Sequence, residues 1–283
     1  MELKAIMKKF RRILSNALAV IGLTACVGTF SACETNQPKV RLTLAFNGET
    51  YDLEYTMYRK ITPTTVKHFL ALVDNDYFDG LCVHDYQVGS AMHTGAYTYA
   101  TDTQELVYKN YYSTVASYIP QSVWLDKYGQ LPTYTLYGES KANDFEVTKG
   151  ALQEQYGALV MTYEEMDEAK DVYVQRNDGE GVSRRDYQEN SATSKFYISL
   201  GTTVKDNSDY CVFATLTEDG VEQLKALQAA INEYIDDTYD GDDSEFTSVV
   251  YGDVVDTLVG DSEKAYDAPK MPIVIESAEV IKF

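Results

Sequence analysis

Basic residues are scarce in this sequence. The 283 residues include 24 Lys and Arg against 44 Asp and Glu, which gives a formal net charge of −20 at pH 7. A protein that binds the phosphate backbone of nucleic acid needs a basic face, and anionic lipid attracts basic segments. The composition therefore argues against nucleic-acid binding and against electrostatic adhesion to anionic membranes.

Histidine is also rare, and this bears on metal chemistry. The three histidines are His68, His84 and His93. None of them forms a pair with HExxH-type spacing, which is the pattern that places two ligands on one helix face. We therefore predict neither a metal site nor a cofactor.

Cysteine is limited to four residues, and two of these lie within the first 33 residues. The other two, Cys82 and Cys211, lie in apolar runs typical of strands. Two thiols in an exported protein can pair as a disulfide. Because neither lies in an evident loop, the sequence favours two buried free thiols over a disulfide.

Long apolar runs are absent except at the start of the chain. Residues 1–32 carry five Lys and Arg against a single Glu, and an apolar run from Ile13 to Phe30 follows the basic start. This order is typical of a secretory signal. A membrane-spanning helix is the alternative, but Ser15 and Asn16 interrupt the run and small residues crowd its end.

The end of the apolar run resembles a bacterial lipoprotein signal, in which a cysteine is lipidated and becomes the first residue. Residues 30–33, Phe-Ser-Ala-Cys, fit this pattern and favour Cys33, because polar residues follow it; Leu-Thr-Ala-Cys, ending at Cys26, is the alternative. The sequence thus predicts a signal peptide at 1–32, a tether at 33–39 and a folded domain at 40–283. Two or more acyl chains suffice for stable anchoring, so we expect a lipid-anchored protein on the extracytoplasmic face of the cell membrane.

Alternating apolar and polar residues predict a β-hairpin at the start of the folded domain. The strands at 40–46 and 51–57 flank Asn47-Gly48, a pair that tolerates positive φ. Helices are predicted at 63–74, after the cap Thr62, and from Asp219, whose spacing to Glu222 fits a capping box. Further strands are predicted at 81–86, 158–162, 195–200, 210–216 and 273–283. Many strands with two helices indicate an antiparallel β-barrel or sandwich.

Three stretches interrupt this pattern, and we interpret them as surface insertions. They are a tyrosine-rich stretch at about 97–136, a polar stretch at 164–188 and an acidic stretch at about 236–270. We expect the tyrosines to pack as a loop on the barrel, with a peptide- or glycan-binding platform as the alternative. The acidic stretch is expected to be a solvated loop, and loose calcium binding stays open.

Several motifs occur in an order that resembles the cyclophilins. They are Ile61–Leu72, Tyr77–Leu81, Tyr137–Glu139, Gly157–Met161, Asn190–Ile198 and Val212–Phe213. The resemblance covers roughly residues 40–283. It implies an all-β-dominated fold, namely a closed eight-stranded antiparallel barrel capped by two α-helices. It also implies a monomeric peptidyl-prolyl cis–trans isomerase whose partners are proline-containing peptides or exported proteins.

Prolyl isomerisation sets simple chemical requirements. Rotation about the peptide bond meets a barrier of about 18–20 kcal/mol, because the C–N bond has partial double-bond character. A catalyst needs an apolar pocket for the proline ring and donors that favour the twisted state over the ground state. In cyclophilins an arginine, two positions past the Phe of a Phe-His-Arg motif, is credited with this role.

This sequence departs from the family at that arginine. The motif reads Val83-His84-Asp85, so that a carboxylate, which has no N–H to donate, replaces a guanidinium. His84 matches a structural histidine of the family. We therefore assign no catalytic residue, and we consider a replacement of the missing guanidinium by Arg184 or Arg185 as an alternative.

Other groove positions differ as well. The resemblance implies a substrate groove formed by His84, Asp85, Ser90, Ala91, His93, Met161, Thr162, Tyr163, Lys195, Tyr197 and Tyr210. Ser90 and Ala91 replace the aromatic residue and the Met that form the proline pocket, and His93 replaces a Gln. The sequence thus predicts a weak isomerase, with an inactive peptide-binding module as the alternative and a purely structural envelope lipoprotein as a third interpretation.

Overall fold

The structure is a computed structural model that describes residues 35–100, 105–111, 113, 121–140, 152–163, 169–176, 181–187, 193–205, 210–254 and 262–283. The predicted signal at 1–32 and the lipidation candidates Cys26 and Cys33 lie outside these residues, as do parts of all three insertions. Among the described residues, no helix combines the length and the apolar character needed to cross a membrane.

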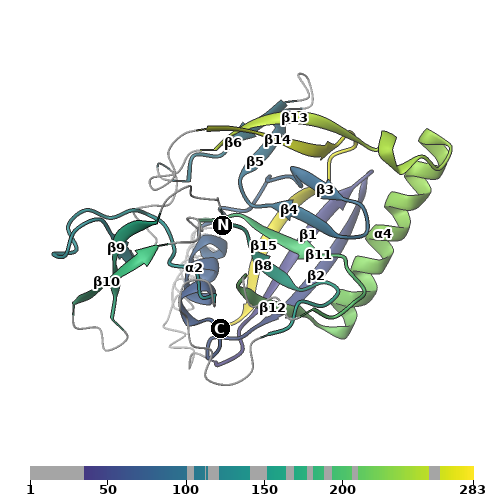
Figure 1. Ribbon diagram of the computed structural model, residues 1–283. Helices are drawn as coiled ribbons and strands as arrows, with labels where there is room; N and C mark the ends of the chain where they lie inside the picture. Colours follow the sequence, from purple (N-terminus) through teal and green to yellow (C-terminus); the bar gives the residue numbers. More distant parts are fainter. Residues whose placement is uncertain are drawn as a thin grey trace, which may run out of the picture. The chain divides into compact units, whose positions relative to one another are not determined.

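An eight-stranded antiparallel sheet forms the framework of the fold (Figure 1). Its strands are β1 (Lys39–Phe46), β2 (Glu49–Met57), β3 (Asp85–Gln87), β4 (Ala91–Thr94), β8 (Leu159–Met161), β11 (Phe196–Ser199), β12 (Val212–Leu216) and β15 (Val274–Lys282). Their order across the sheet is β15-β1-β2-β12-β8-β11-β4-β3. The strands that the sequence predicted are confirmed, although β3 begins later than expected.

The first hairpin shows how the sequence dictates this sheet. Alternate residues of β1 are buried, and each residue from Lys39 to Phe46 pairs with a residue of β2. The turn residues Asn47 and Gly48 have φ values of 49° and 87°. Positive φ at both positions matches the right-handed twist of the two strands, so the predicted hairpin is confirmed.

The sheet curls into a half-barrel, and its two outer strands are not neighbours in one ladder. The segment before β3 approaches β15 through an isolated bridge between Cys82 and Val274. Gly80 N–H also donates to the Ile275 carbonyl at 2.8 Å, and Ile275 N–H donates to the Leu81 carbonyl at 2.7 Å. The half-barrel agrees with the predicted all-β framework, whereas its full closure stays a prediction.

Helix α2 (Pro63–Asp74) packs its apolar face on the sheet, as predicted. Its N-terminus is not capped by the side chain of Thr62. Instead, the buried carboxylate of Glu139 accepts the backbone N–H groups of Thr64 and Thr65 at 3.0 and 2.9 Å. Glu139, 74 residues away from Thr65 in sequence, therefore satisfies two of the free donors that every helix start presents.

His68 is placed differently from expectation. Its position on α2 suggested an exposed side chain, yet it is buried, and its Nε2 lies 2.6 Å from the carbonyl oxygen of Thr193. The hydroxyl of Tyr111 lies 3.3 Å from the same nitrogen. The segments around Thr193 and Tyr111 thus cover a helix face that the sequence pattern assigned to solvent.

Helix α4 (Glu218–Tyr239) begins two residues earlier than its sequence pattern suggests. Thr217 is the N-cap, and its hydroxyl accepts the N–H of Gly220 at 3.2 Å. The capping box predicted at Asp219 and Glu222 is therefore wrong. A glycine is required at position 220, because a Cβ there would lie 2.8 Å from the carbonyl oxygen of Glu54.

The main core lies between the sheet and the two helices and is rich in aromatic rings. Phe69 of α2 contacts Phe78, Phe196 and Phe213, with ring centroids 4.8 to 5.3 Å apart. Such offset and edge contacts add to the stability gained from burial alone. The cysteines Cys82 and Cys211 are buried and free, as predicted.

The three insertions contain regular structure rather than loops alone. They include β5 (Tyr97–Ala100), β6 (Glu105–Tyr108), β7 (Val123–Trp124), β9 (Lys170–Gln175), β10 (Val182–Tyr187), the 3₁₀ turn η2 (Asp243–Glu245), β13 (Thr247–Val254) and β14 (Ser262–Pro269). Strands β10, β9 and β7 form one small sheet, and β5–β6 and β13–β14 form two hairpins. Sequence inspection missed these strands because their apolar residues follow no clean period.

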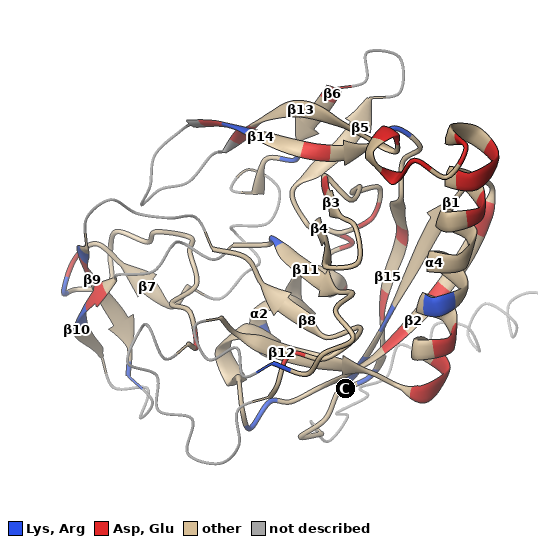
Figure 2. Ribbon diagram, turned by 45° about the vertical axis from the view of Figure 1, so that its right-hand side comes forward, with Lys and Arg blue, Asp and Glu red and all other residues tan. Residues whose placement is uncertain are grey.

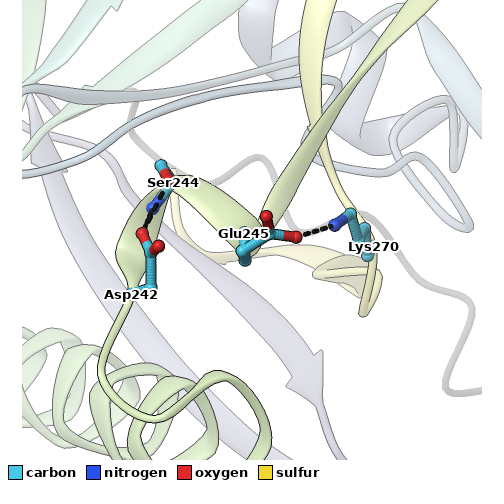
Figure 3. Close-up of polar contacts among 4 residues, drawn as sticks. All are labelled: Asp242, Ser244, Glu245 and Lys270. Atoms are coloured by element: carbon cyan, nitrogen blue, oxygen red, sulfur yellow. Dashed lines mark hydrogen bonds and ion pairs between the residues drawn. The ribbon is translucent and has the colours of Figure 1, made fainter.

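The turn η2 joins α4 to the β13–β14 hairpin, and short polar contacts fix it (Figure 3). Asp242 accepts from the backbone N–H and the hydroxyl of Ser244 at 3.1 and 2.6 Å, and Lys270 donates to Glu245 at 3.2 Å. Lys270 N–H also donates to the Phe246 carbonyl at 2.9 Å. The two ends of the hairpin therefore leave the body of the protein side by side.

The acidic and tyrosine-rich insertions pack on each other and on the edge of the sheet. Their shared apolar cluster contains Cys82, Ala96, Tyr97, Leu106, Tyr266 and Ala268. The hydroxyls of Tyr97 and Tyr266 lie 3.2 Å apart, and Tyr97 also donates to the carbonyl of Asp253 at 2.8 Å. The expectation that the acidic stretch is a solvated loop is wrong for its described part. The expectation that the tyrosines pack against the body of the protein is confirmed for Tyr97 and Tyr111, which are buried.

Candidate functional site

Three of the predicted groove residues form a row across neighbouring strands. Asp85 of β3 lies directly opposite His93 of β4, and His93 lies directly opposite Tyr197 of β11. Side chains alternate between the two faces of a strand. Because the neighbouring Met92 and Phe196 belong to the main core, the row lies on the outer face of the sheet.

The carboxylate of Asp85 is engaged in contacts within the chain. Its Oδ1 accepts the backbone N–H of Asp267 on β14 at 3.0 Å, and its Oδ2 accepts the side-chain amide of Gln87 at 2.9 Å. The side chain is only 17% exposed. Asp85 thus fastens the β13–β14 hairpin beside the row, a role that the sequence did not indicate.

His93 occupies the middle of the row. Its ring centroid lies 5.0 Å from that of Tyr197, and its Nε2 lies 4.0 Å from Oδ2 of Asp85. Burial lowers the pKa of His93, and this effect outweighs the nearby Asp85 carboxylate, which raises it. The imidazole is therefore uncharged at neutral pH and offers one N–H donor and one acceptor.

Tyr197 ends the row next to a buried glutamate that sequence reasoning missed. The Tyr197 hydroxyl donates to Oε2 of Glu154 at 3.2 Å, and the Ser199 hydroxyl donates to Oε1 at 2.9 Å. Glu154 is only 6% exposed and forms an isolated bridge with Lys205. No motif marks Glu154, because only the pairing of two loops brings it to the sheet.

A small apolar cluster continues the outer face beyond Tyr197. Ala158, Val160 and Val212 are buried there, and Leu152 and Tyr197 pack against them. Val160 lies opposite both Tyr197 and Val212, so it extends the same row across β8 and β12. Leu152 comes from the segment that also carries Glu154, and this segment therefore covers part of the outer face.

Ala91 and Ser90 lie close to the row. Ala91 pairs with Gln87 and with Ser199, which places it on the outer face beside the row, and it is buried. Ser90 is exposed in the turn before β4, and its carbonyl accepts the N–H of Leu200 at 2.7 Å. Neither side chain offers the large apolar surface of the family residues.

His84 lies beneath the row rather than in it. It is buried, and its ring contacts Tyr97 and Tyr266 edge-on, at centroid distances of 4.9 and 4.8 Å. Its Nδ1 has no hydrogen-bond partner within the described part of the chain. Burial lowers the pKa of His84 well below its usual range, so the ring is neutral and structural.

Several of the remaining groove candidates are separated from the row. Met161 and Tyr163 are buried in the main core, although the resemblance assigned them to the groove. Thr162 N–H donates to the carbonyl of the buried Lys195 at 3.0 Å. Tyr210 is 44% exposed and stacks on Tyr163, with centroids 6.0 Å apart. The structure therefore brings together Asp85, His93 and Tyr197 but not Met161, Tyr163 or Tyr210, whereas Lys195 acts on His93, whose pKa is lowered by burial and also by the positive charge of Lys195.

The two insertion arginines lie on β10, in the small sheet with β9 and β7. Arg184 bonds to Asp171 at 2.5 Å and lies 3.8 Å from Asp186, both within its own hairpin. Arg185 pairs with Val172 of β9. Arg184 is thus neutralised in its own sheet, and it does not replace the guanidinium missing from the row.

A family model described as cyclophilin type peptidyl-prolyl cis-trans isomerase/CLD matches residues 41–242, which is more than half of the chain. None of the curated proteins compared with the chain matches it.

Similar solved structures have low sequence identity. A crystal structure of a cyclophilin type peptidyl-prolyl cis-trans isomerase from Cryptosporidium parvum is 15% identical and covers 87% of this chain and 99% of its own, with a TM-score of 0.42. A second crystal structure of it, in the presence of the dipeptide Ala-Pro, is 16% identical, with the same coverage and a TM-score of 0.40. The Mimivirus cyclophilin is 15% identical and covers 70% of this chain and 80% of its own, with a TM-score of 0.39.

Proposed function

Because this chain belongs to the cyclophilin-type peptidyl-prolyl cis–trans isomerase family, we propose that it is a lipid-anchored, extracytoplasmic member with weak isomerase activity. Its substrates are proline-containing segments of exported proteins. The basic start, the apolar run and Cys33 support the anchor, with Cys26 as the alternative. The folded domain acts as a monomer, and its barrel is closed between the segment before β3 and β15.

The proposal that the activity is weak rests on one observation, namely the hydrogen bonds that the Asp85 carboxylate accepts within the chain. Catalysis of prolyl rotation needs a donor that binds the twisted state more tightly than the ground state. A carboxylate is an acceptor only, and both Asp85 oxygens already accept bonds from Asp267 and Gln87. The position therefore contributes structure rather than transition-state stabilisation.

The other two residues of the row, His93 and Tyr197, support peptide binding and a modest acceleration of rotation about the prolyl bond. The Tyr197 ring offers an aromatic face against which a proline ring can pack, and its bond to Glu154 holds its orientation. The neutral imidazole of His93 can donate one N–H to a carbonyl of the bound peptide. A neutral donor stabilises developing charge less than a guanidinium, because charge-assisted hydrogen bonds are roughly twice as strong.

The proposal is tested by isomerisation of an Ala-Pro peptide, followed by NMR exchange. We expect rates above the uncatalysed background but at least about a hundredfold below those of arginine-bearing cyclophilins, since one positioned donor is worth about that factor. Tyr197→Ala should lower the exchange rate to the uncatalysed background. Tyr128→Ala, a change in an exposed tyrosine far from the row in sequence, should leave it unchanged. Rates as fast as those of arginine-bearing relatives would contradict the proposal.

The engaged carboxylate also favours a second candidate function, an inactive peptide-binding module. In that case the peptide would bind saturably, as measured by isothermal titration calorimetry, while exchange stayed at background. Tyr197→Ala would then weaken peptide binding, and the exchange rate would stay at background in both proteins. Background exchange together with absent binding would exclude both candidates.

A further inference from the structure

The first described residues are held by the fold and do not form a free linker. Backbone bonds run from Thr35 N–H to the Phe283 carbonyl at 3.0 Å, from Arg59 N–H to the Asn36 carbonyl at 3.2 Å and from Met57 N–H to the Pro38 carbonyl at 2.9 Å. Strand β1 then starts at Lys39. The folded body of the protein therefore already includes Thr35, which lies inside the segment that the sequence assigned to a tether.

This early start limits the reach of the anchor that the proposed function assigns to Cys33. Only Glu34 separates Cys33 from Thr35 in the sequence. Two residues span at most about 7 Å, even when fully extended. If the anchor were at Cys26, nine residues would allow about 30 Å of reach, and the body could turn freely.

The surface around Thr35 has a mixed apolar and basic character. Its exposed residues are Asn36, Gln37, Lys60, Ile281, Lys282 and Phe283. Ile281 is 36% exposed and Phe283 is 41% exposed. Lys282 lies directly opposite Lys39 across β15 and β1 (Figure 2). Lys39 Nζ forms an ion pair with Glu54 at 2.5 Å, so the exposed lysines Lys60 and Lys282 give this surface its basic character.

We propose, on the basis of the Cys33 anchor, that this surface rests on the headgroups of the phospholipid bilayer. The lipidated residue lies at the headgroup level, and the short connection keeps Thr35 within about 7 Å of it. Exposed apolar side chains and lysines suit this zone, because apolar parts enter the acyl boundary while amines stay in water. The protein therefore lies on the bilayer in one orientation.

That orientation directs the Asp85 end of the candidate row away from the membrane. Strand β15 runs from Val274, beside the cluster that contains Tyr266, to Lys282, beside Thr35. Eight residue steps of about 3.3 Å separate its ends by about 26 Å. Asp85, which bonds to Asp267 next to Tyr266, lies at the end remote from the bilayer. Figures 1 and 2 both show the chain end and the β13–β14 hairpin on opposite sides of the sheet.

The test uses the full chain, expressed in a bacterial host and placed in vesicles of phosphatidylethanolamine and phosphatidylglycerol that contain a nitroxide-headgroup lipid. Mass spectrometry of the N-terminal fragment identifies the lipidated cysteine. A fluorophore is attached in Lys60→Cys, whose chain neighbour Arg59 bonds to Asn36, or in the matched control Tyr251→Cys on β13, where the native side chain is 60% exposed. Cys82 and Cys211 are buried, and burial raises the pKa of Cys82 to about 12, so neither takes up label.

With lipid confirmed on Cys33, we expect the label at position 60 to be quenched several-fold more than the label at position 251. A flexible Gly-Ser spacer of about ten residues after Glu34 should remove this difference while lipidation persists. Equal quenching at the two positions without the spacer would overturn the orientation and leave the anchor intact. Lipid on Cys26, or no lipid, would overturn the Cys33 anchor and this inference together, and the mass spectrum separates that outcome from the first.

Discussion

At the scale of single residues, Asp85 shows how a change of chemistry is accommodated. The family resemblance places an arginine there, which would project a cation from β3. The aspartate instead accepts the N–H of Asp267 from an insertion 182 residues later in the chain. The identity of residue 85 could be read from the sequence, but its partner could not, because no local pattern predicts where β14 returns.

Buried histidines offer a prediction at the same scale. Burial lowers the pKa of His68 to about 4, from an ordinary value of 6.5. The unfolded chain therefore binds this proton more readily, so the contribution of neutral His68 is complete above pH 6.5 and is lost as the pH falls toward 4. At pH 4.5 the loss is about 2 to 3 kcal/mol.

His68→Gln keeps an N–H that can reach the Thr193 carbonyl but cannot be protonated. We expect the difference in unfolding free energy between pH 7 and pH 4.5 to shrink by about 2 kcal/mol in this variant. Urea titrations at the two pH values measure it. His84 still titrates in both proteins, so some pH dependence remains. An unchanged difference would show that His68 is not neutral and buried.

At the scale of secondary-structure elements, local patterns located the helices better than their caps. The apolar spacing of α4 is clear from sequence, yet Asp219 and Glu222 offered a capping box that the structure does not use. Thr217 caps the helix because Gly220 allows a close approach to the carbonyl of Glu54. That approach depends on β2, which the local pattern of α4 does not contain.

The cap provides a direct prediction. Thr217→Ala removes the acceptor for Gly220 N–H and should lower the unfolding free energy by about 1 kcal/mol. Thr217→Ser keeps the hydroxyl and should be nearly neutral. Asp219→Ala should cost less than Thr217→Ala, since Asp219 contributes only through the helix dipole. Denaturant midpoints compare the three variants. A larger loss of stability in Asp219→Ala than in Thr217→Ala would show that the capping box at Asp219 forms after all.

At the scale of the whole molecule, the insertions are part of the structural body. Tyr97, from one insertion, and Tyr266, from another, share a cluster that covers Cys82 and His84. The acidic hairpin therefore stabilises the edge of the sheet on which the candidate row begins. Charge alone suggested a solvated loop, because composition does not reveal that alternate residues of β14 face inward.

Removal of the hairpin tests this arrangement. Lys270 N–H bonds to the Phe246 carbonyl, so an Asn-Gly turn can replace residues 247–269 without moving its ends. We expect the variant to fold and Cys82 to become reactive toward a thiol reagent, because the hairpin buries it and burial raises its pKa to about 12. Cys211, in the main core, should stay protected.

The thiol measurement uses proteins with Cys26 and Cys33 replaced by Ser, so that only two cysteines report. Circular dichroism confirms that the shortened protein keeps its helices. If the variant is folded and Cys82 stays unreactive, the hairpin does not cover the sheet edge, and the shared cluster is not what protects Cys82.

The sequence by itself determined the features that depend on residues close together in the chain, within one or two helical turns or two consecutive strands. Alternation in β1 and β2 with Asn47-Gly48 gave the hairpin, the spacing in α2 gave its buried face, and the ordered motifs gave the family. The tertiary structure alone decided the cap by Glu139, the burial of His68 and the engagement of Asp85 by Asp267. These contacts join residues 74 to 182 positions apart. A local period fixes which side of an element is apolar, whereas the path of the whole chain selects what packs against it.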